Sequence, residues 1–234
     1  MKSFLLAFSF LFTIFGLRAQ NNKYKEIMDQ DWAELKTYRE ANKKLKAKDI
    51  KPVAVFMGNS ITEGWVNASP GFFKENNYIG RGIGGQTSPQ MLLRFMQDVI
   101  DLQPEVVVIL AGTNDIAGNT GYASVDMITD NIKAMAQLAE TNNIEVVLSS
   151  ILPVADYPWR PGLEPVEKIA AVNTWLREYA QMNNFIYLDY FSHMKNSENG
   201  MRAELSEDGV HPNKKAYSLM QPLAKEAIEK ALKN

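Results

Sequence analysis

Short apolar runs alternate with longer amphipathic segments along most of the chain. The short runs are rich in β-branched residues, which is typical of strands buried on both faces of a sheet. These expected strands cover residues 53–57, 77–79, 105–111, 144–148 and 185–188. Between and after them, hydrophobic residues recur every three or four positions, which predicts helices. These expected helices cover residues 87–99, 124–141, 166–182 and 212–232.

The alternation of strands and helices predicts an α/β fold, in which a parallel sheet carries helices on both faces. It runs over residues 51–234 without a linker or repeat, so we expect one domain there. Residues 20–50 carry apolar side chains at helical spacing and a lysine-rich end, which predicts an amphipathic helix packed on that domain. Four prolines in residues 153–165 predict an irregular loop.

The first 19 residues have the pattern of a secretory signal peptide. Lys2 is followed by an uncharged, mostly apolar run over residues 3–17 and then by Arg18 and Ala19. The run is shorter than the roughly 20 residues of a membrane span, and an uncleaved anchor is the alternative interpretation. We therefore expect cleavage after Ala19 and export, either to the periplasm or out of the cell.

Charge and cysteine content exclude several classes of function. The formal net charge is −2, which does not favour a nucleic-acid-binding protein. The chain has no cysteine, so cysteine nucleophiles, cysteine-ligated metals and the lipid anchor of bacterial lipoproteins are ruled out. The mature protein is thus expected to lack a stable membrane anchor.

Four polar or glycine-rich motifs follow expected strands or precede the last helix. They are Gly58-Asn59-Ser60, Gly82-Ile83-Gly84-Gly85-Gln86-Thr87, Gly112-Thr113-Asn114-Asp115 and Asp208-Gly209-Val210-His211-Pro212. The carboxyl ends of parallel strands lie along one edge of a sheet, so the first three motifs are expected to share a crevice. The fourth precedes the last helix and can reach the same edge.

The residue types in these motifs favour acyl transfer. A serine hydroxyl such as that of Ser60 needs a base to take its proton, and an imidazole titrates near neutral pH. Asp208 lies three residues before His211 and can fix the tautomer of its ring. Backbone N–H groups of a glycine-rich turn and the amide of Asn114 are suitable donors to an oxyanion. Each motif alone is more typical of a turn or a helix cap. Acyl transfer is favoured by the order of the four motifs along the chain and by their positions next to predicted strands and helices.

Taken together, the motifs resemble those of the SGNH (GDSL-like) hydrolases. Ser60, Gly85 and Asn114 match the first three conserved blocks of that family, and Asp208 with His211 matches the last. The motif forms are most similar to the branch that includes platelet-activating-factor acetylhydrolase and small carbohydrate esterases. The resemblance implies a three-layer α/β/α, flavodoxin-like fold with a five-stranded parallel sheet.

The resemblance also implies a role for each matched residue. Ser60 is expected to be the nucleophile, His211 the base and Asp208 its orienting partner, while Ser60, Gly85 and Asn114 form the oxyanion hole. No metal and no cofactor are implied. The chain departs from the family at one place, because Asn59 stands where an aspartate usually precedes the serine.

The expected function is that of an exported serine ester hydrolase that removes short acyl groups, first of all acetyl, from carbohydrate. A lysophospholipase or an acyl thioesterase is the alternative. A function of a different class is a non-catalytic carbohydrate-binding module on the same fold, which could contact a sugar through Tyr157, Trp159 and Arg160 of the proline-rich loop. The alternative for Trp159 is a loop anchor packed on the domain.

Other chemistries fit the sequence less well. Gly80-x-Gly82-x-x-Gly85 matches a dinucleotide fingerprint, but its strand signal is short and the expected acidic residue is missing. Thr62 stands where the elbow of α/β-hydrolases has glycine. A metal hydrolase needs about three ligands, and we interpret His193 and Asp189 as structural. Asp115 is expected to brace its own loop.

Overall fold

Five parallel strands form the centre of the computed structural model, which describes residues 30–234. Their spatial order is β2-β1-β3-β4-β5, the doubly wound order of flavodoxin-like folds. The strands are β1 (Ala54–Gly58), β2 (Tyr78–Gly82), β3 (Val106–Ile109), β4 (Glu145–Ser149) and β5 (Ile186–Leu188). All neighbouring pairs are parallel, which confirms the predicted α/β fold and its five-stranded sheet.

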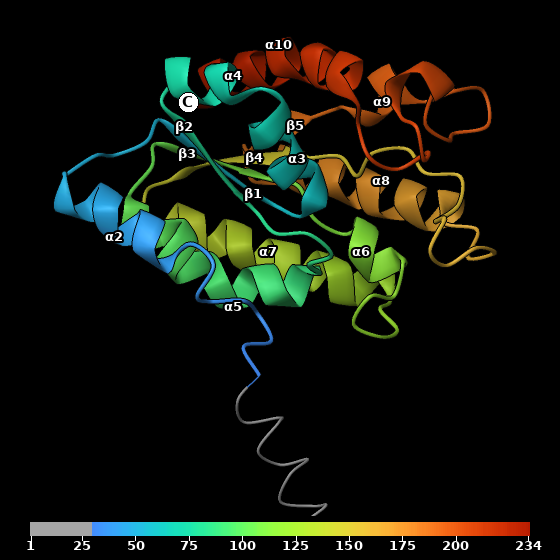
Figure 1. The fold of residues 1–234 in the computed structure, drawn as a ribbon, viewed down its shortest axis with the longest axis horizontal. Coiled ribbons are helices and arrows are strands. Elements are labelled where there is room, and N and C mark those ends of the chain that lie inside the picture. Colours follow the sequence, from blue (N-terminus) through green and yellow to red (C-terminus); the bar gives the residue numbers. More distant parts are fainter. Residues whose placement is uncertain (1–29) are drawn as a thin grey trace, which may run out of the picture.

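Helices cover both faces of the sheet (Figure 1). One face carries α3 (Ser60–Ala68), α4 (Pro70–Glu75), α9 (Phe191–Met194) and α10 (Lys214–Ala231). The other face carries α2 (Arg39–Ala47), α5 (Ser88–Asp98), α7 (Val125–Thr141) and α8 (Val166–Met182). Three single-turn elements complete the described chain, namely η1 (Ile100–Leu102), α6 (Thr113–Ile116) and η2 (Ala203–Leu205).

Alternate residues of the central strands enter two separate cores. In β1, Val55 and Met57 join the core under α5, α7 and α8, whereas Ala54 and Phe56 join the core under α3, α4 and α10. All four side chains are almost completely buried. Because neither face of the strand meets water, β1 reads as a continuous apolar run rather than as an alternation.

An aromatic cluster holds α3 on the sheet. The indole of Trp65 stacks on Phe72 and on Tyr217 of α10, with ring centroids 5.5 and 5.7 Å apart, and meets Phe56 of β1 edge to face at 5.5 Å. Aromatic pairs at these distances contribute about 0.5–1.5 kcal/mol each beyond their buried area. This packing fixes the helix whose first residue is Ser60.

The helix α3 was not predicted from the sequence, because it is short and begins only two residues after β1. Its backbone lies directly against β2. A β-carbon at Gly82 would come within 2.3 Å of the Glu63 nitrogen, and one at Gly80 within 2.2 Å of a methyl group of Val66. The two strand glycines of the apparent dinucleotide fingerprint are therefore required for helix packing.

The predicted helix over residues 20–50 is too long. Residues 20–29, and the predicted signal peptide over residues 1–19, lie outside the described residues. Within the described part, only α2 is helical, and residues 30–38 form a series of turns that we call the N-terminal strap. The strap includes Glu34 in the left-handed region, with φ of 54°, which a continuous helix cannot accommodate.

Side chains from α5 and its preceding loop replace the helical hydrogen bonds of the strap. The amides of three glutamines donate to strap carbonyls: Gln90 to Trp32 at 2.6 Å, Gln86 to Ala33 at 2.9 Å and Gln97 to Leu35 at 2.7 Å. The helical periodicity of the strap is therefore overridden by contacts with residues more than fifty positions away.

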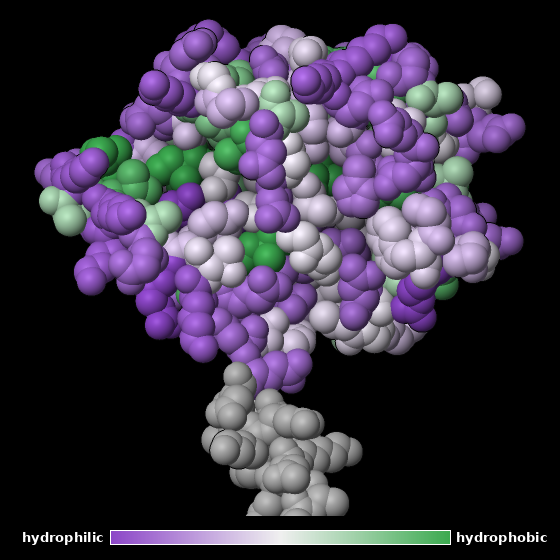
Figure 2. Space-filling view, in the orientation of Figure 1, coloured by the Kyte–Doolittle hydropathy of each residue, from purple (hydrophilic) through white to green (hydrophobic). Residues whose placement is uncertain are grey.

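The surface seen in Figure 2 is mostly hydrophilic or intermediate, and its hydrophobic residues form small, separated patches. Within residues 30–234, no helix combines the length and the apolar character that crossing a membrane would require.

Candidate active site

Ser60 occupies the first turn of α3, directly after β1. Asn59 caps this helix, because its side-chain oxygen accepts the N–H of Ile61 at 3.0 Å. The substitution of asparagine for the usual aspartate therefore keeps the capping function, although the Asn59 amide nitrogen is buried and finds no partner in the described chain. The N–H of Ser60 has no acceptor among the described residues and lies at the positive end of the helix.

Ser60, His211 and Asp208 form one hydrogen-bonded chain. The hydroxyl oxygen of Ser60 lies 3.0 Å from Nε2 of His211. On the opposite edge of the ring, Nδ1 lies 2.6 Å from Oδ2 of Asp208. Both distances fall within hydrogen-bond range, and the imidazole is positioned to exchange a proton with the serine. The structure thus brings together three residues that are separated by up to 151 positions in the sequence.

The Asp208 carboxylate is held in its charged form. Its Oδ1 accepts the backbone N–H groups of Val210 and His211, at 2.9 and 2.7 Å, and the hydroxyl of Ser206 at 3.0 Å. Partial burial alone would raise the pKa of Asp208, but the hydrogen bonds from the His211 ring and from these N–H groups outweigh it and hold the pKa well below its ordinary value.

Gly85 and Asn114 follow β2 and β3, at the edge of the sheet where β1 ends before Ser60. Gly85 has φ of +75°, and its N–H has no acceptor among the described residues. The amide nitrogen of Asn114 donates to the carbonyl of Gln86 at 2.9 Å. An amide nitrogen carries two hydrogens, so this bond orients the group and leaves a second donor. The predicted oxyanion-hole residues therefore offer unused N–H groups at the same edge.

A buried guanidinium connects the first two motifs. Arg94 of α5 is fully buried and donates to the carbonyl of Gly58 at 2.9 Å and to the side-chain oxygen of Gln86 at 2.6 Å. Its charge is balanced by Asp98, at 3.0 Å. Burial lowers the pKa of Arg94, and the hydrogen bond and charge of Asp98 oppose that effect. Nothing in the local pattern of α5 indicated this role.

Asp115 braces a different segment from the one predicted. Its carboxylate accepts the N–H of Ser88 at 2.9 Å and the Ser88 hydroxyl at 2.6 Å, and so ties the third motif to the start of α5. Burial raises the pKa of Asp115, while the bonds from Ser88 lower it. The prediction that this residue braces its own loop was wrong, because the acceptor meets donors at a helix start 27 positions earlier.

Trp159 reaches the site from the proline-rich loop. Its indole lies beside the imidazole of His211, with ring centroids 5.9 Å apart, and its N–H donates to the side-chain oxygen of Asn119 at 3.3 Å. The indole is 42% exposed, so Trp159 is not simply a buried loop anchor. Asp189, in contrast, accepts the N–H and hydroxyl of Ser192, as expected for a structural residue.

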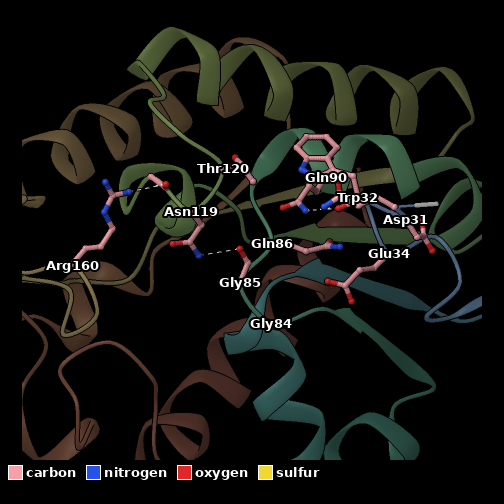
Figure 3. Close-up of a pocket in the computed structure, with 12 residues that line it drawn as sticks. Asp31, Trp32, Glu34, Gly84, Gly85, Gln86, Gln90, Asn119, Thr120 and Arg160 are labelled. Atoms are coloured by element: carbon pink, nitrogen blue, oxygen red, sulfur yellow. Dashed lines mark hydrogen bonds between the residues drawn. The ribbon is translucent and has the colours of Figure 1, made fainter. Parts of the chain in front are cut away.

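Two grooves flank the predicted oxyanion hole. The first, which we call the serine groove, has a volume of about 810 Å³ and is lined by Ser60, His211, Tyr217 and by small and polar residues near them in the sequence. The second, the glycine groove, has a volume of about 660 Å³ and borders Gly85 (Figure 3). Neither groove is lined by leucine, isoleucine, valine, methionine or phenylalanine. In residues 30–234, no group of three or more metal-ligating side chains is found.

Comparisons with known proteins agree with this architecture. A sequence model described as the GDSL-like lipase/acylhydrolase family matches residues 56–219. A crystal structure from Bacteroides fragilis NCTC 9343, described as an acylhydrolase, is 47% identical with a TM-score of 0.83, over 87% of this chain and 100% of that one. The acetyl xylan esterase AlAXEase is 23% identical with a TM-score of 0.62, over 74% of this chain and 98% of its own, and shows the fold alone.

A curated relative covers a smaller region. The uncharacterized lipoprotein YqeF of Bacillus subtilis (strain 168) is 30% identical over 96 residues, and the match spans 39% of this chain and 40% of that protein. The family match, in contrast, covers well over half of the chain and includes all four of its motifs. The chain therefore belongs to the GDSL-like lipase/acylhydrolase family and is an ester hydrolase.

Proposed function

We propose that the protein is an exported serine esterase that removes acetyl groups from carbohydrate. The observation that carries the proposal is the hydrogen-bonded chain from Ser60 through His211 to Asp208. Such a chain supplies the base that a serine hydroxyl needs, and the orienting carboxylate that the base needs.

In the proposed mechanism, the Ser60 oxygen attacks the ester carbonyl carbon while Nε2 of His211 takes its proton. The carbonyl oxygen becomes an oxyanion, which accepts hydrogen bonds from the N–H groups of Ser60 and Gly85 and from the Asn114 amide. The imidazolium then gives its proton to the departing sugar oxygen, and an acyl-serine remains. Water, deprotonated by the same imidazole, attacks this intermediate, and acetate leaves as Ser60 regains its proton.

We favour a short acyl group because no leucine, isoleucine, valine, methionine or phenylalanine side chain lines either groove. Each methylene transferred from water to an apolar surface contributes about 0.8 kcal/mol, and an acyl chain gains this only where apolar side chains receive it. Among residues 30–234, Tyr217 and Trp32 are the only large apolar side chains that line the two grooves. The likeness in fold to an acetyl xylan esterase also supports acetyl as the group removed.

We expect kcat/KM for p-nitrophenyl acetate to exceed that for p-nitrophenyl octanoate by at least about tenfold, or 1.4 kcal/mol. Neither groove offers a large aliphatic side chain to receive the additional methylenes of the octanoyl chain. The two esters share a leaving group and should be compared below the concentration at which the longer ester aggregates. A preference for octanoate would instead support the alternative, a lysophospholipase or acyl thioesterase.

Activity is expected to rise with pH between about pH 5 and 8. His211 can accept the Ser60 proton only when its ring is neutral, and histidine side chains lose a proton in this range. The pKa of Asp208 lies well below its ordinary value, so its carboxylate stays charged over this range and adds no second transition to the pH profile. The measurement is kcat/KM for p-nitrophenyl acetate against pH. A flat profile across this range would argue against His211 as the base.

Export rests on the signal-peptide pattern of the first 19 residues and is supported by the similarity to a protein named as a lipoprotein. Expression in a Gram-negative host is expected to yield a periplasmic protein whose N-terminal residue is Gln20. Intact mass measurement of the periplasmic fraction checks this. A chain that keeps Met1 and remains with the membrane would favour the uncleaved anchor.

A further inference from the structure

The glycine groove lies between two segments that are far apart in the sequence. The strap forms one wall, with Trp32 and Glu34, and residues 118–120 with Arg160 form the opposite wall (Figure 3). Gly85, a proposed oxyanion donor, lies between them and belongs to the groove as well. A ligand in the groove therefore begins next to the carbon that Ser60 is proposed to attack.

One exposed indole lines this groove, and a second is hydrogen-bonded to a residue of its opposite wall. Trp32 is 43% exposed and lines the groove directly, and Trp159 is 42% exposed and reaches the opposite wall through its hydrogen bond to Asn119. Leaving a large aromatic surface in water forgoes the free energy that its burial would release. Aromatic faces held in this way are suited to receive a flat, partly apolar ligand surface, such as the C–H face of a pyranose ring.

The polar groups of the groove suit a neutral ligand rich in hydroxyl groups. Asp31 and Glu34 provide acceptors, Asn119 and Arg160 provide donors, and all are planar groups that can bind neighbouring hydroxyls. Two carboxylates and one guanidinium belong to the lining, and Nη1 of that guanidinium already donates to the carbonyls of Ala117 and Gly118 at 2.9 and 2.8 Å. Besides the N–H of Leu35, the nearby charges of Lys36 and Arg39 lower the pKa of Asp31, so the groove has no strong excess of positive charge that would favour a phosphate-bearing lipid headgroup.

The wall that carries Trp32 is fixed before any ligand binds. The Trp32 carbonyl accepts the Gln90 amide at 2.6 Å, and the next carbonyl, of Ala33, accepts the Gln86 amide at 2.9 Å. The Asp31 carboxylate accepts the N–H groups of Leu35 and Lys36 at 2.9 and 3.0 Å. Because the strap is held by these bonds, little conformational entropy remains to be lost when a ligand stacks on the indole.

We propose that the glycine groove is a saccharide subsite, in which the strap holds the sugar chain on the alcohol side of the acetyl ester. This inference rests on the proposed function, because it assigns the groove beside the same oxyanion hole. It makes Trp32 a residue that determines the preference for carbohydrate esters over simple esters.

The test compares Trp32→Ala with the wild-type enzyme on two probes, acetylated xylo-oligosaccharides and p-nitrophenyl acetate. We expect kcat/KM for the oligosaccharides to fall at least about tenfold more than kcat/KM for the aryl ester, mainly through KM. Trp32→Phe, which keeps an aromatic face, is expected to recover a large part of the loss. The matched control is Leu93→Ala on α5, which removes a side chain that is 59% exposed and does not line the groove; it should leave both activities unchanged.

Equal losses on both probes in Trp32→Ala, or no loss on either, would overturn the subsite. The same holds if the wild-type enzyme hydrolyses the aryl ester but not the oligosaccharides. A wild-type enzyme that hydrolyses neither probe would instead overturn the proposed function itself. If Glu34→Gln creates activity toward lysophosphatidylcholine at the expense of the oligosaccharides, the groove holds a lipid headgroup and the saccharide assignment is wrong.

Discussion

Ser60→Ala is expected to lower kcat for p-nitrophenyl acetate by about 10⁶, which is the loss found when a serine nucleophile is removed from a complete triad. The residual rate would come from the oxyanion donors and from substrate binding, which this variant keeps. The hydroxyl of Ser60 has a single partner in the described chain, His211. The fold and the melting temperature should therefore be almost unchanged, and the loss can be assigned to chemistry.

Two observations make the Ser60 experiment decisive. A fluorophosphonate should add its phosphonyl group to the wild-type chain but not to the variant, as measured by intact mass. Ser218→Ala is the matched control, because the Ser218 hydroxyl only donates to the carbonyl of Lys214 on the exposed side of α10. Turnover by Ser60→Ala at the wild-type rate would refute the assignment of the nucleophile.

Asp208→Asn is expected to lower kcat by about 10⁴ at neutral pH. The side-chain oxygen of asparagine can still accept the N–H groups of Val210 and His211, so the loop should keep its shape. The new NH₂ group, however, would face Nδ1 of His211 where an acceptor now lies 2.6 Å away. The ring would then carry its proton on Nε2, and that nitrogen could no longer accept the proton of Ser60.

The control for this second experiment is Asp189→Asn. Asp189 also accepts a backbone N–H, that of Ser192 at 3.0 Å, but it follows the edge strand β5 and lines neither groove. Its replacement should leave kcat within about twofold of the wild-type value, as is usual for surface substitutions. If Asp208→Asn retained most of its activity with an unchanged melting temperature, Asp208 would not set the tautomer of His211.

The sequence alone was sufficient for the class of fold and for most of the sheet, and it supplied the candidate residues of the predicted site. A strand buried on both faces can only be a run of apolar residues, so β1, β3 and β4 are visible in the local pattern. Parallel strands end at one edge, so motifs that follow β1, β2 and β3 must converge there whatever the details of packing. The fourth motif follows no strand, and it is the tertiary structure that places Nε2 of His211 3.0 Å from the hydroxyl oxygen of Ser60.

Local pattern was misleading where partners from distant segments satisfy the backbone. Residues 30–38 have helical periodicity, yet glutamines from α5 and its preceding loop take their carbonyls and convert the segment into the strap. Asp115 was assigned to its own loop, but it binds Ser88. In both cases a hydrogen bond between segments that are distant in the sequence overrode the local pattern.

The sequence by itself determined the class of fold, the family and the residues that could carry acyl transfer. These depend on hydrophobic periodicity and on the order of short motifs along the chain, and both can be read without the tertiary structure. Only the tertiary structure decided what surrounds them. The strap, the loop that carries Trp159 and the turn at Gly85 meet in one groove because hydrogen bonds and packing across the fold place them there. The proposed binding of the alcohol part of the ester depends on the groove that these three segments form.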